Sequence, residues 1–184
     1  MRDGDWAGVV DGFKMIAPAW DSERRQDTLS ALRQTIPEYH FGAQPLSVAS
    51  VEGTRYLGYG WSQPESWADR SGVWSDGASA SILLRLEEEP RSDVLLQLDG
   101  IDFVNAKCPE QHVDVSVNST TIGELTYTQE NAEGPRSIRV PQEILVGHHG
   151  LVVIRFRFKN DISPARLGLS ADSRDLALWL RASR

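Results

Sequence analysis

Apolar side chains recur at every second position along most of the chain from about residue 51 onward. The clearest example spans 152–159, where the apolar residues alternate with Arg155, Arg157 and Lys159. Similar alternation marks six further segments, at 80–86, 94–98, 113–117, 122–127, 138–140 and 175–182. A period of two places one row of side chains on each face of an extended strand. The pattern therefore predicts seven or eight short strands.

Turn-forming residues separate these strands. Glu87-Glu88-Glu89-Pro90 interrupts the pattern after 80–86, and Asn118-Ser119 begins a turn after 113–117. No long helical segment lies between consecutive strands, so we do not expect a parallel α/β sheet. Two stacked sheets would give each strand one dry face and one wet face. The predicted fold class is all-β, an antiparallel, jelly-roll-like β-sandwich over residues 51–184.

The first 50 residues follow a helical period instead. Between residues 5 and 16, one helical face carries Trp6, Val9, Val10, Phe13 and Ile16. Pro18 ends this run, and a second helix is predicted from Asp21 or Ser22 to about Gln34, before Pro37. We expect residues 1–50 to form a short N-terminal helical arm. Such an arm either packs on a neighbour or serves oligomerisation or contact with a partner domain.

Composition narrows the function classes. The chain has 184 residues, 40% of them hydrophobic and 24% charged, which suits one globular domain with an extension. The net charge of −7 disfavours nucleic acid and anionic membranes, because both require a basic surface. No apolar run could span a bilayer, and no apolar segment follows the charged residues after Met1. We therefore expect no membrane insertion, no secretory signal and a cytoplasmic location.

The stretch from Tyr56 to Ser75 is the richest in candidate chemistry, with five aromatic residues, two carboxylates and one arginine. Aromatic faces suit the apolar faces of sugar rings, and the charged groups can hydrogen-bond ring hydroxyls. The predicted ligand-binding residues in this stretch are Trp61, Glu65, Trp67, Asp69, Arg70 and Trp74. An alternative stays open, in which Trp61 and Trp74 fill the core and the charged residues fix the loop. Trp67 lies in a polar loop, where exposure is expected.

A second stretch, residues 163–175, precedes the last predicted strand. Asp172 and Arg174 flank Ser173, so the carboxylate can cap a turn while the guanidinium pairs with a second acid, such as Glu65 or Asp69. Asp172 and Arg174 complete the predicted ligand-binding set. Here too a purely structural role is open, in which the ion pair fixes two loops.

The sequence recommends no catalytic residue, metal site or cofactor. A glycosidase pair needs two carboxyls about 5–10 Å apart, which Glu65 with Asp69 or Asp172 could provide, but their spacing does not specify that distance. The adjacent His148-His149 pair would point in diverging directions and fits a turn better than a metal site. The single cysteine, Cys108, permits no internal disulfide.

One acidic stretch could hold calcium. Asp99, Asp102 and Asn105 offer oxygen ligands within a few residues of one another. The EF-hand spacing is missing, however, and Asp and Asn are common turn residues. We therefore expect turn-forming roles for these three residues.

Several motifs stand in order along both stretches: Gly60-Trp61-Ser62 with Pro64-Glu65, Gly72-Val73-Trp74-Ser75 with Gly77, Ser163-Pro164, and Asp172-Ser173-Arg174-Asp175-Leu176. They resemble those of an uncharacterised β-sandwich domain found on bacterial glycosyltransferases and other surface-polysaccharide assembly proteins. The resemblance covers about residues 54–182. It implies a jelly-roll-like accessory domain in glycan assembly, with Trp61, Glu65, Trp74, Asp172 and Arg174 as family-defining residues. It implies no transferase chemistry, because no nucleotide-sugar-binding unit fits in this chain.

These observations predict a noncatalytic carbohydrate-binding or accessory module associated with bacterial surface-polysaccharide biosynthesis. The expected partner is a glycan. A first alternative is a protein–protein interaction or assembly domain that self-associates or binds a partner protein through residues 1–50. A second is a polysaccharide-acting enzyme that uses Glu65 with Asp69 or Asp172.

Overall fold

The computed structural model describes residues 34–41, 45–67 and 70–183. The predicted helices at 5–16 and from 21 or 22 to 34 lie outside this range, except for Gln34, as does Asp69. The chain divides into two compact units, Met1–Ile36 and Pro37–Arg184.

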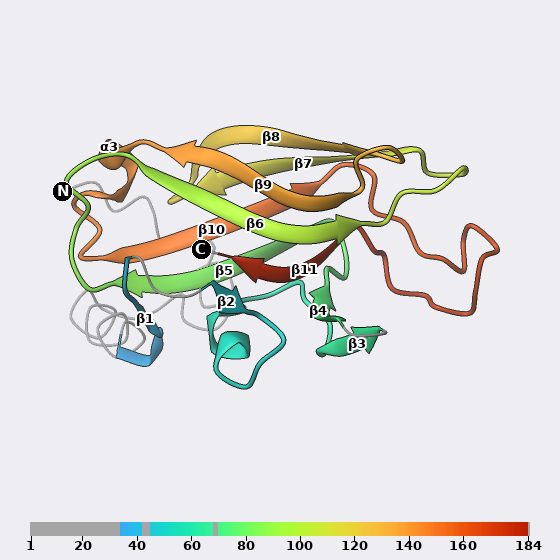
Figure 1. The fold of residues 1–184 in the computed structure, drawn as a ribbon, viewed down its shortest axis with the longest axis horizontal. Helices are drawn as coiled ribbons and strands as arrows, with labels where there is room; N and C mark the ends of the chain where they lie inside the picture. Colours follow the sequence, from blue (N-terminus) through green and yellow to red (C-terminus); the bar gives the residue numbers. More distant parts are fainter. Residues whose placement is uncertain (1–33, 42–44, 68–69, 184) are drawn as a thin grey trace, which may run out of the picture. The chain divides into compact units, whose positions relative to one another are not determined.

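The second unit consists of two packed β-sheets (Figure 1). The first has the strand order β1-β5-β10-β7-β8, with bounds Glu38–Tyr39, Ser79–Leu86, Leu151–Phe158, Glu110–Val117 and Thr120–Thr128. The second has the order β3-β4-β11-β6-β9, with bounds Glu65–Trp67, Arg70–Trp74, Leu178–Ser183, Val94–Asp102 and Glu133–Val140. Strand β2 (Leu46–Ser47) pairs with β11. Two short helical turns complete the unit, η1 (Gly53–Tyr56) and α3 (Gln142–Leu145).

The described strand pairs are antiparallel, apart from β1 with β5. This arrangement confirms the all-β antiparallel sandwich that the alternating pattern predicts. Strands β1 and β2 precede residue 51, yet they pair with β5 and β11. The division at residue 50 stays a prediction.

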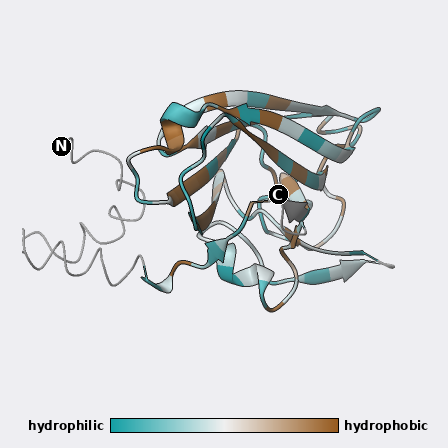
Figure 2. Ribbon diagram, turned by 60° about the vertical axis from the view of Figure 1, so that its left-hand side comes forward, coloured by the Kyte–Doolittle hydropathy of each residue, from teal (hydrophilic) through white to brown (hydrophobic). Residues whose placement is uncertain are grey.

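The core lies between the two sheets, and hydrophobic residues recur along the strands (Figure 2). On β10, Ile154 and Phe156 are at most 4% exposed, whereas Arg157 on the opposite face is exposed. On β11, Leu178 and Leu180 belong to the core. Trp179 projects from the other face of the same strand and is nevertheless buried. The outer side of this sheet is therefore covered locally.

Two local features refine the sequence-based picture. Alternation does not begin at residue 51, because residues 53–56 form the 3₁₀ turn η1, which buries Tyr56. The turn at Asn118-Ser119 is a two-residue hairpin between β7 and β8, with φ of 46° and 70°. Positive φ at both central residues is the type I′ geometry, whose twist matches that of the flanking strands. None of the helical segments in the described part of the chain has the length and apolar character that crossing a bilayer requires.

Candidate functional site

The Trp-rich stretch forms a hairpin at the edge of the second sheet. Its register pairs Trp67 with Arg70 and Glu65 with Gly72. Directly paired residues of antiparallel strands share a face. Val73 on β4 is fully buried in the core, so the alternate positions, which carry these four residues, face outward. Trp67 is 70% exposed. The hairpin therefore presents an indole ring between an acidic and a basic side chain.

Trp74 lies further along the same face and packs against other aromatic rings. Its ring centroid is 6.1 Å from that of Trp179 and 6.2 Å from that of Phe103, which it meets edge-on. Gly72 makes room for this cluster, because a Cβ atom there would lie 2.6 Å from the Trp179 ring. Trp74 is half-buried as a result and connects the exposed hairpin to the body of the sheet.

Trp61 is also half-buried and packs against the core. Its ring meets Phe156 edge-on at 5.9 Å, and its indole nitrogen donates a hydrogen bond of 2.7 Å to the carbonyl of Ser81. The ring of Trp61 and its indole nitrogen are thus both in contact with other residues of the protein. Among the predicted ligand-binding tryptophans, Trp67 is thus the one with the most accessible ring.

A row of ion pairs crosses the outer side of the second sheet. Arg70 donates to Glu133 at 2.5 Å, and Glu133 also accepts from Arg181 at 2.9 Å. Arg181 in turn donates to Asp99 at 2.7 Å. Strands β4, β9, β11 and β6 each contribute one member of this row. Because each charged group touches the next, the Arg70 side chain beside Trp67 has restricted freedom.

Arg174 joins the second stretch to the hairpin. Its guanidinium donates to the Asp172 carboxylate at 2.6 Å and also to Glu65. The pairing that the sequence suggested for Arg174 and Glu65 is therefore present, and it links residues 109 positions apart. The Arg174 hydrogen bond holds the pKa of Asp172 below its usual value. An acid that stays ionised is a poor proton donor, so this geometry does not favour Asp172 as a general acid.

The other motif residues organise the same end of the sandwich. The fully buried Ser75 hydroxyl oxygen accepts hydrogen bonds from the backbone N–H groups of Ala177 and Leu178, at 3.1 and 3.0 Å. Ala165 donates its N–H to the carbonyl of Asp172 at 2.8 Å, which closes the loop before β11. Several residues that carry the family resemblance thus stabilise the loops around the hairpin.

The remaining sequence candidates are separate from this face, apart from Asp99, which belongs to the row of ion pairs. Asp99 and Asp102 lie within strand β6 and not in the expected turn. His149 occupies a turn before β10 with φ of 53°. The Asn105 side-chain oxygen accepts from the N–H groups of Lys107 and Cys108, at 2.9 and 3.1 Å, which is a turn-forming role. Asp102 is 3% exposed. No three His, Cys, Asp or Glu residues gather into a metal-binding group within residues 34–41, 45–67 and 70–183.

Sequence reasoning missed Phe103, Glu133 and Arg181 as members of this surface. Phe103 follows the predicted strand at 94–98, and Arg181 alternates with Leu180 on β11. Neither position indicates which residues the side chain contacts in the fold. Glu133 meets Arg70 and Arg181 only because β9 pairs with β6 in one register. The pairing between distant strands supplies this information, and local sequence does not.

No protein-family model matches this sequence, and no curated protein matches it. Among solved structures, the chain is similar to the CBM36-1 domain of a multidomain xylanase from the hindgut metagenome of Trinervitermes trinervoides, with 13% identity, a TM-score of 0.38 and coverage of 69% of this chain and 86% of that one. A carbohydrate-binding module CBM36 in complex with calcium and xylotriose gives 12% identity, a TM-score of 0.39 and coverage of 77% and 96%.

CsCBM6-3 from Clostridium stercorarium in complex with cellobiose gives 10% identity, a TM-score of 0.37 and coverage of 68% and 81%.

Proposed function

We propose that this chain is a noncatalytic carbohydrate-binding module and that the outward face of the β3–β4 hairpin is its binding site. The proposal rests chiefly on one observation. Trp67 is 70% exposed, and Glu65 and Arg70 project from the same side of the same hairpin. A flat indole offers apolar area to a sugar ring, while neighbouring charged groups hydrogen-bond its hydroxyls.

The ion pairs prepare this face for binding. Glu65 is held by Arg174, and Arg70 by Glu133, so these side chains lose little conformational freedom when a ligand arrives. A carboxylate has about four lone-pair sites, so Glu65 can accept from a hydroxyl while it keeps its ion pair. Neutral sugars fit a face whose charges already compensate each other.

We place this module in bacterial surface-polysaccharide biosynthesis, in association with a glycosyltransferase. Support for this setting comes from the ordered motifs between Gly60 and Leu176, which resemble domains found on such proteins. In that setting the module would hold a growing or finished glycan near a separate catalytic unit.

Calorimetric titration of the full chain with a panel of neutral oligosaccharides tests the proposal. We expect weak binding that Trp67→Ala reduces by about tenfold or more, because loss of a central aromatic contact dominates small binding sites. Trp67→Tyr should keep most of the affinity, since it retains a flat ring. Val146→Ala is the matched control, because it removes a side chain that is 42% exposed from the turn after α3.

Two outcomes would count against a glycan site here. One is a broad panel without binding, and the other is binding that Trp67→Ala leaves unchanged. Analytical ultracentrifugation of the same samples would then test the alternative of a protein-assembly domain, which requires a concentration-dependent oligomer or a dedicated partner.

A further inference from the structure

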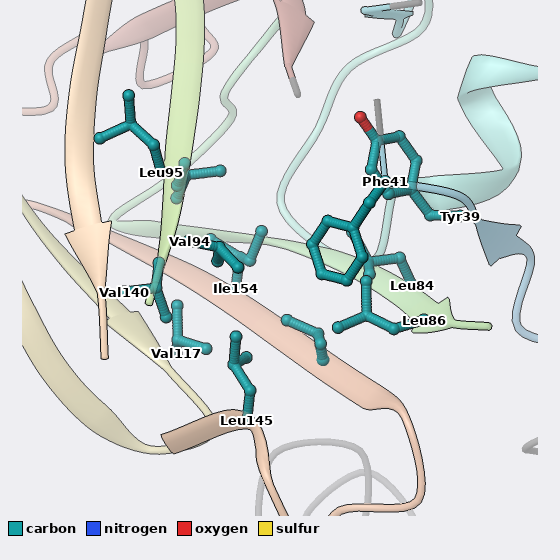
Figure 3. Close-up of a pocket in the computed structure, with 12 residues that line it drawn as sticks. Tyr39, Phe41, Leu84, Leu86, Val94, Leu95, Val117, Val140, Leu145 and Ile154 are labelled. Atoms are coloured by element: carbon teal, nitrogen blue, oxygen red, sulfur yellow. The ribbon is translucent and has the colours of Figure 1, made fainter. Parts of the chain in front are cut away.

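A second potential site lies inside the sandwich. Where β5 and β9 end and β6 and β10 begin, the two sheets line a partly open cavity of about 340 Å³. Figure 3 shows its walls, which come from both sheets, from α3 and from the chain around β1. Leu84, Val94, Val140, Leu145 and Ile154 are among the residues that line it.

The chemistry of the walls restricts what can bind. Tyr39 is the one residue with a polar side-chain atom among the described residues that line the cavity. A buried water needs two to four polar partners, and a sugar needs partners for each hydroxyl that it buries. The side chains of the described lining residues meet neither requirement. The cavity therefore suits an apolar molecule and differs in kind from the hairpin face around Trp67.

The size of the cavity and its opening favour a linear hydrocarbon chain over a single ring as the ligand. A cavity of about 150 Å³ in another protein accommodates benzene, so a volume more than twice as large accommodates on the order of ten carbon atoms. Phe41 and Leu95 contribute to the lining and are 50% and 55% exposed. Apolar surface thus continues from the interior to the outside, along which a chain could enter.

Charged residues that follow a lining residue in the chain would act on the head of such a molecule. Glu87, Glu88 and Glu89 directly follow the lining residue Leu86, and all three are exposed. Glu87 is 2.6 Å from His40, and Glu89 accepts from the N–H of Gly147 at 3.0 Å. A row of carboxylates repels an anionic head group and tolerates a neutral one.

We propose that this cavity binds the hydrocarbon chain of an uncharged single-chain amphiphile, with on the order of ten carbons in the chain. The site is independent of the proposed glycan face. The cavity lies at the beginning of β6, whereas the hairpin is joined through β11 to the far end of that strand.

Displacement of a neutral fluorescent probe from the full chain tests this proposal. N-phenyl-1-naphthylamine is bound first, and 1-alkanols from hexanol to dodecanol then compete with it. Burial of each added methylene should strengthen competition about fourfold, until the cavity is filled near decanol. Decanoate, which has the same number of carbons and an anionic head, should compete several-fold less well than decanol.

Cavity-filling variants identify the site. Val140→Phe and Val94→Phe each place a larger ring in the cavity, and either should weaken decanol competition by about tenfold or more, provided that it still unfolds cooperatively. Ser137→Phe is the matched control, since it introduces the same ring at an exposed position of β9. Trp67→Ala should leave decanol competition unchanged, which separates this site from the glycan face.

Three results would overturn the proposal. No alkanol displaces the probe, competition does not rise with chain length, or both folded filling variants bind decanol as the unmodified protein does. Equal competition by decanoate and decanol would refute the role assigned to Glu87, Glu88 and Glu89.

Discussion

Replacing Asp102 by asparagine tests how the core accommodates an acidic side chain. Asp102 lies at the end of β6, is 3% exposed, and has no hydrogen-bond partner at either carboxylate oxygen. Burial raises its pKa to about 8, and the positive charge of Arg136 offsets only part of this effect. The folded protein therefore holds this group largely protonated at neutral pH. Asn has a similar shape and does not ionise.

The magnitude follows from the difference in pKa between the folded and unfolded chains. The ordinary value for the Asp102 carboxyl is 3.8, so between pH 4 and pH 8 the unfolded chain releases a proton that the folded chain keeps. Below about pH 4 the carboxyl is protonated in both the folded and the unfolded chain, so its stabilising contribution is fully present. This contribution is lost as the pH rises from 4 towards 8, by about 1.4 kcal/mol per pH unit. At pH 7 the loss amounts to on the order of 4 kcal/mol.

Urea unfolding followed by tryptophan fluorescence measures this effect. We compare the unmodified protein with Asp102→Asn at several values between pH 4.5 and pH 8. The advantage of the variant in free energy of unfolding should grow by about 3 kcal/mol between pH 4.5 and pH 7. Other titrating groups are common to both proteins, so their effects largely cancel in the difference. Any fixed cost of burying the amide changes the free energy of unfolding by the same amount at both pH values.

Asp99→Asn is the control, because it alters an acid on the same strand that pairs with Arg181 at 2.7 Å. Unlike Asp102→Asn, this variant removes a carboxylate that is exposed and paired, so it controls for the loss of an acid from the same strand. If the difference between Asp102→Asn and the unmodified protein is the same at pH 4.5 and pH 7, the carboxyl is not kept protonated by burial, and the reasoning fails.

Three further substitutions test the loops and the hairpin, each by chemical unfolding. Gly72→Ala should cost about 1–3 kcal/mol, because the added Cβ would lie 2.6 Å from the Trp179 ring; an unchanged near-ultraviolet spectrum would contradict this contact. Ser75→Ala should cost about 2–4 kcal/mol, since two buried N–H groups lose their acceptor, whereas Ser75→Thr should recover part of this loss if the hydroxyl matters. Asn118→Ala should cost about 2–4 kcal/mol, because the Asn118 side-chain oxygen accepts a hydrogen bond from the Val153 N–H and the Asn118 backbone has φ of 46°; a loss under 0.5 kcal/mol would argue against both roles.

The strands from Ser79 onward could be predicted because apolar side chains that face the core alternate along much of their length. Strands β3 and β4 could not. They have three and five residues, and their sequence mixes Ser, Gly and Trp without a clear period. Exposure of Trp67 agreed with its polar surroundings. The partial burial of Trp61 and Trp74 depends on Phe156, Trp179 and other residues far away in the sequence.

The charged residues also include some whose roles local sequence could suggest and others whose roles depend on the fold. Arg174 and Glu65 could be suggested as partners because each lies in a stretch of unusual composition, but only the fold brings them within bonding distance. Asp102 lies between Asp99 and Asn105, in a stretch that reads as turn-forming, and nothing local distinguishes it from its neighbours. Its burial follows from the pairing of β6 with β11, which places it opposite Leu178 inside the sandwich.

The positions of the cavity and of Asp102 have a consequence for local opening. Apolar side chains are incompletely packed at one end of β6, and a carboxyl lacks partners at the other, while Val115 and Phe156 in the middle of their strands are fully buried. Amide hydrogens at the strand ends should therefore exchange with deuterium through small fraying motions. Those at the centres of β7 and β10 should exchange only when the whole sandwich comes apart.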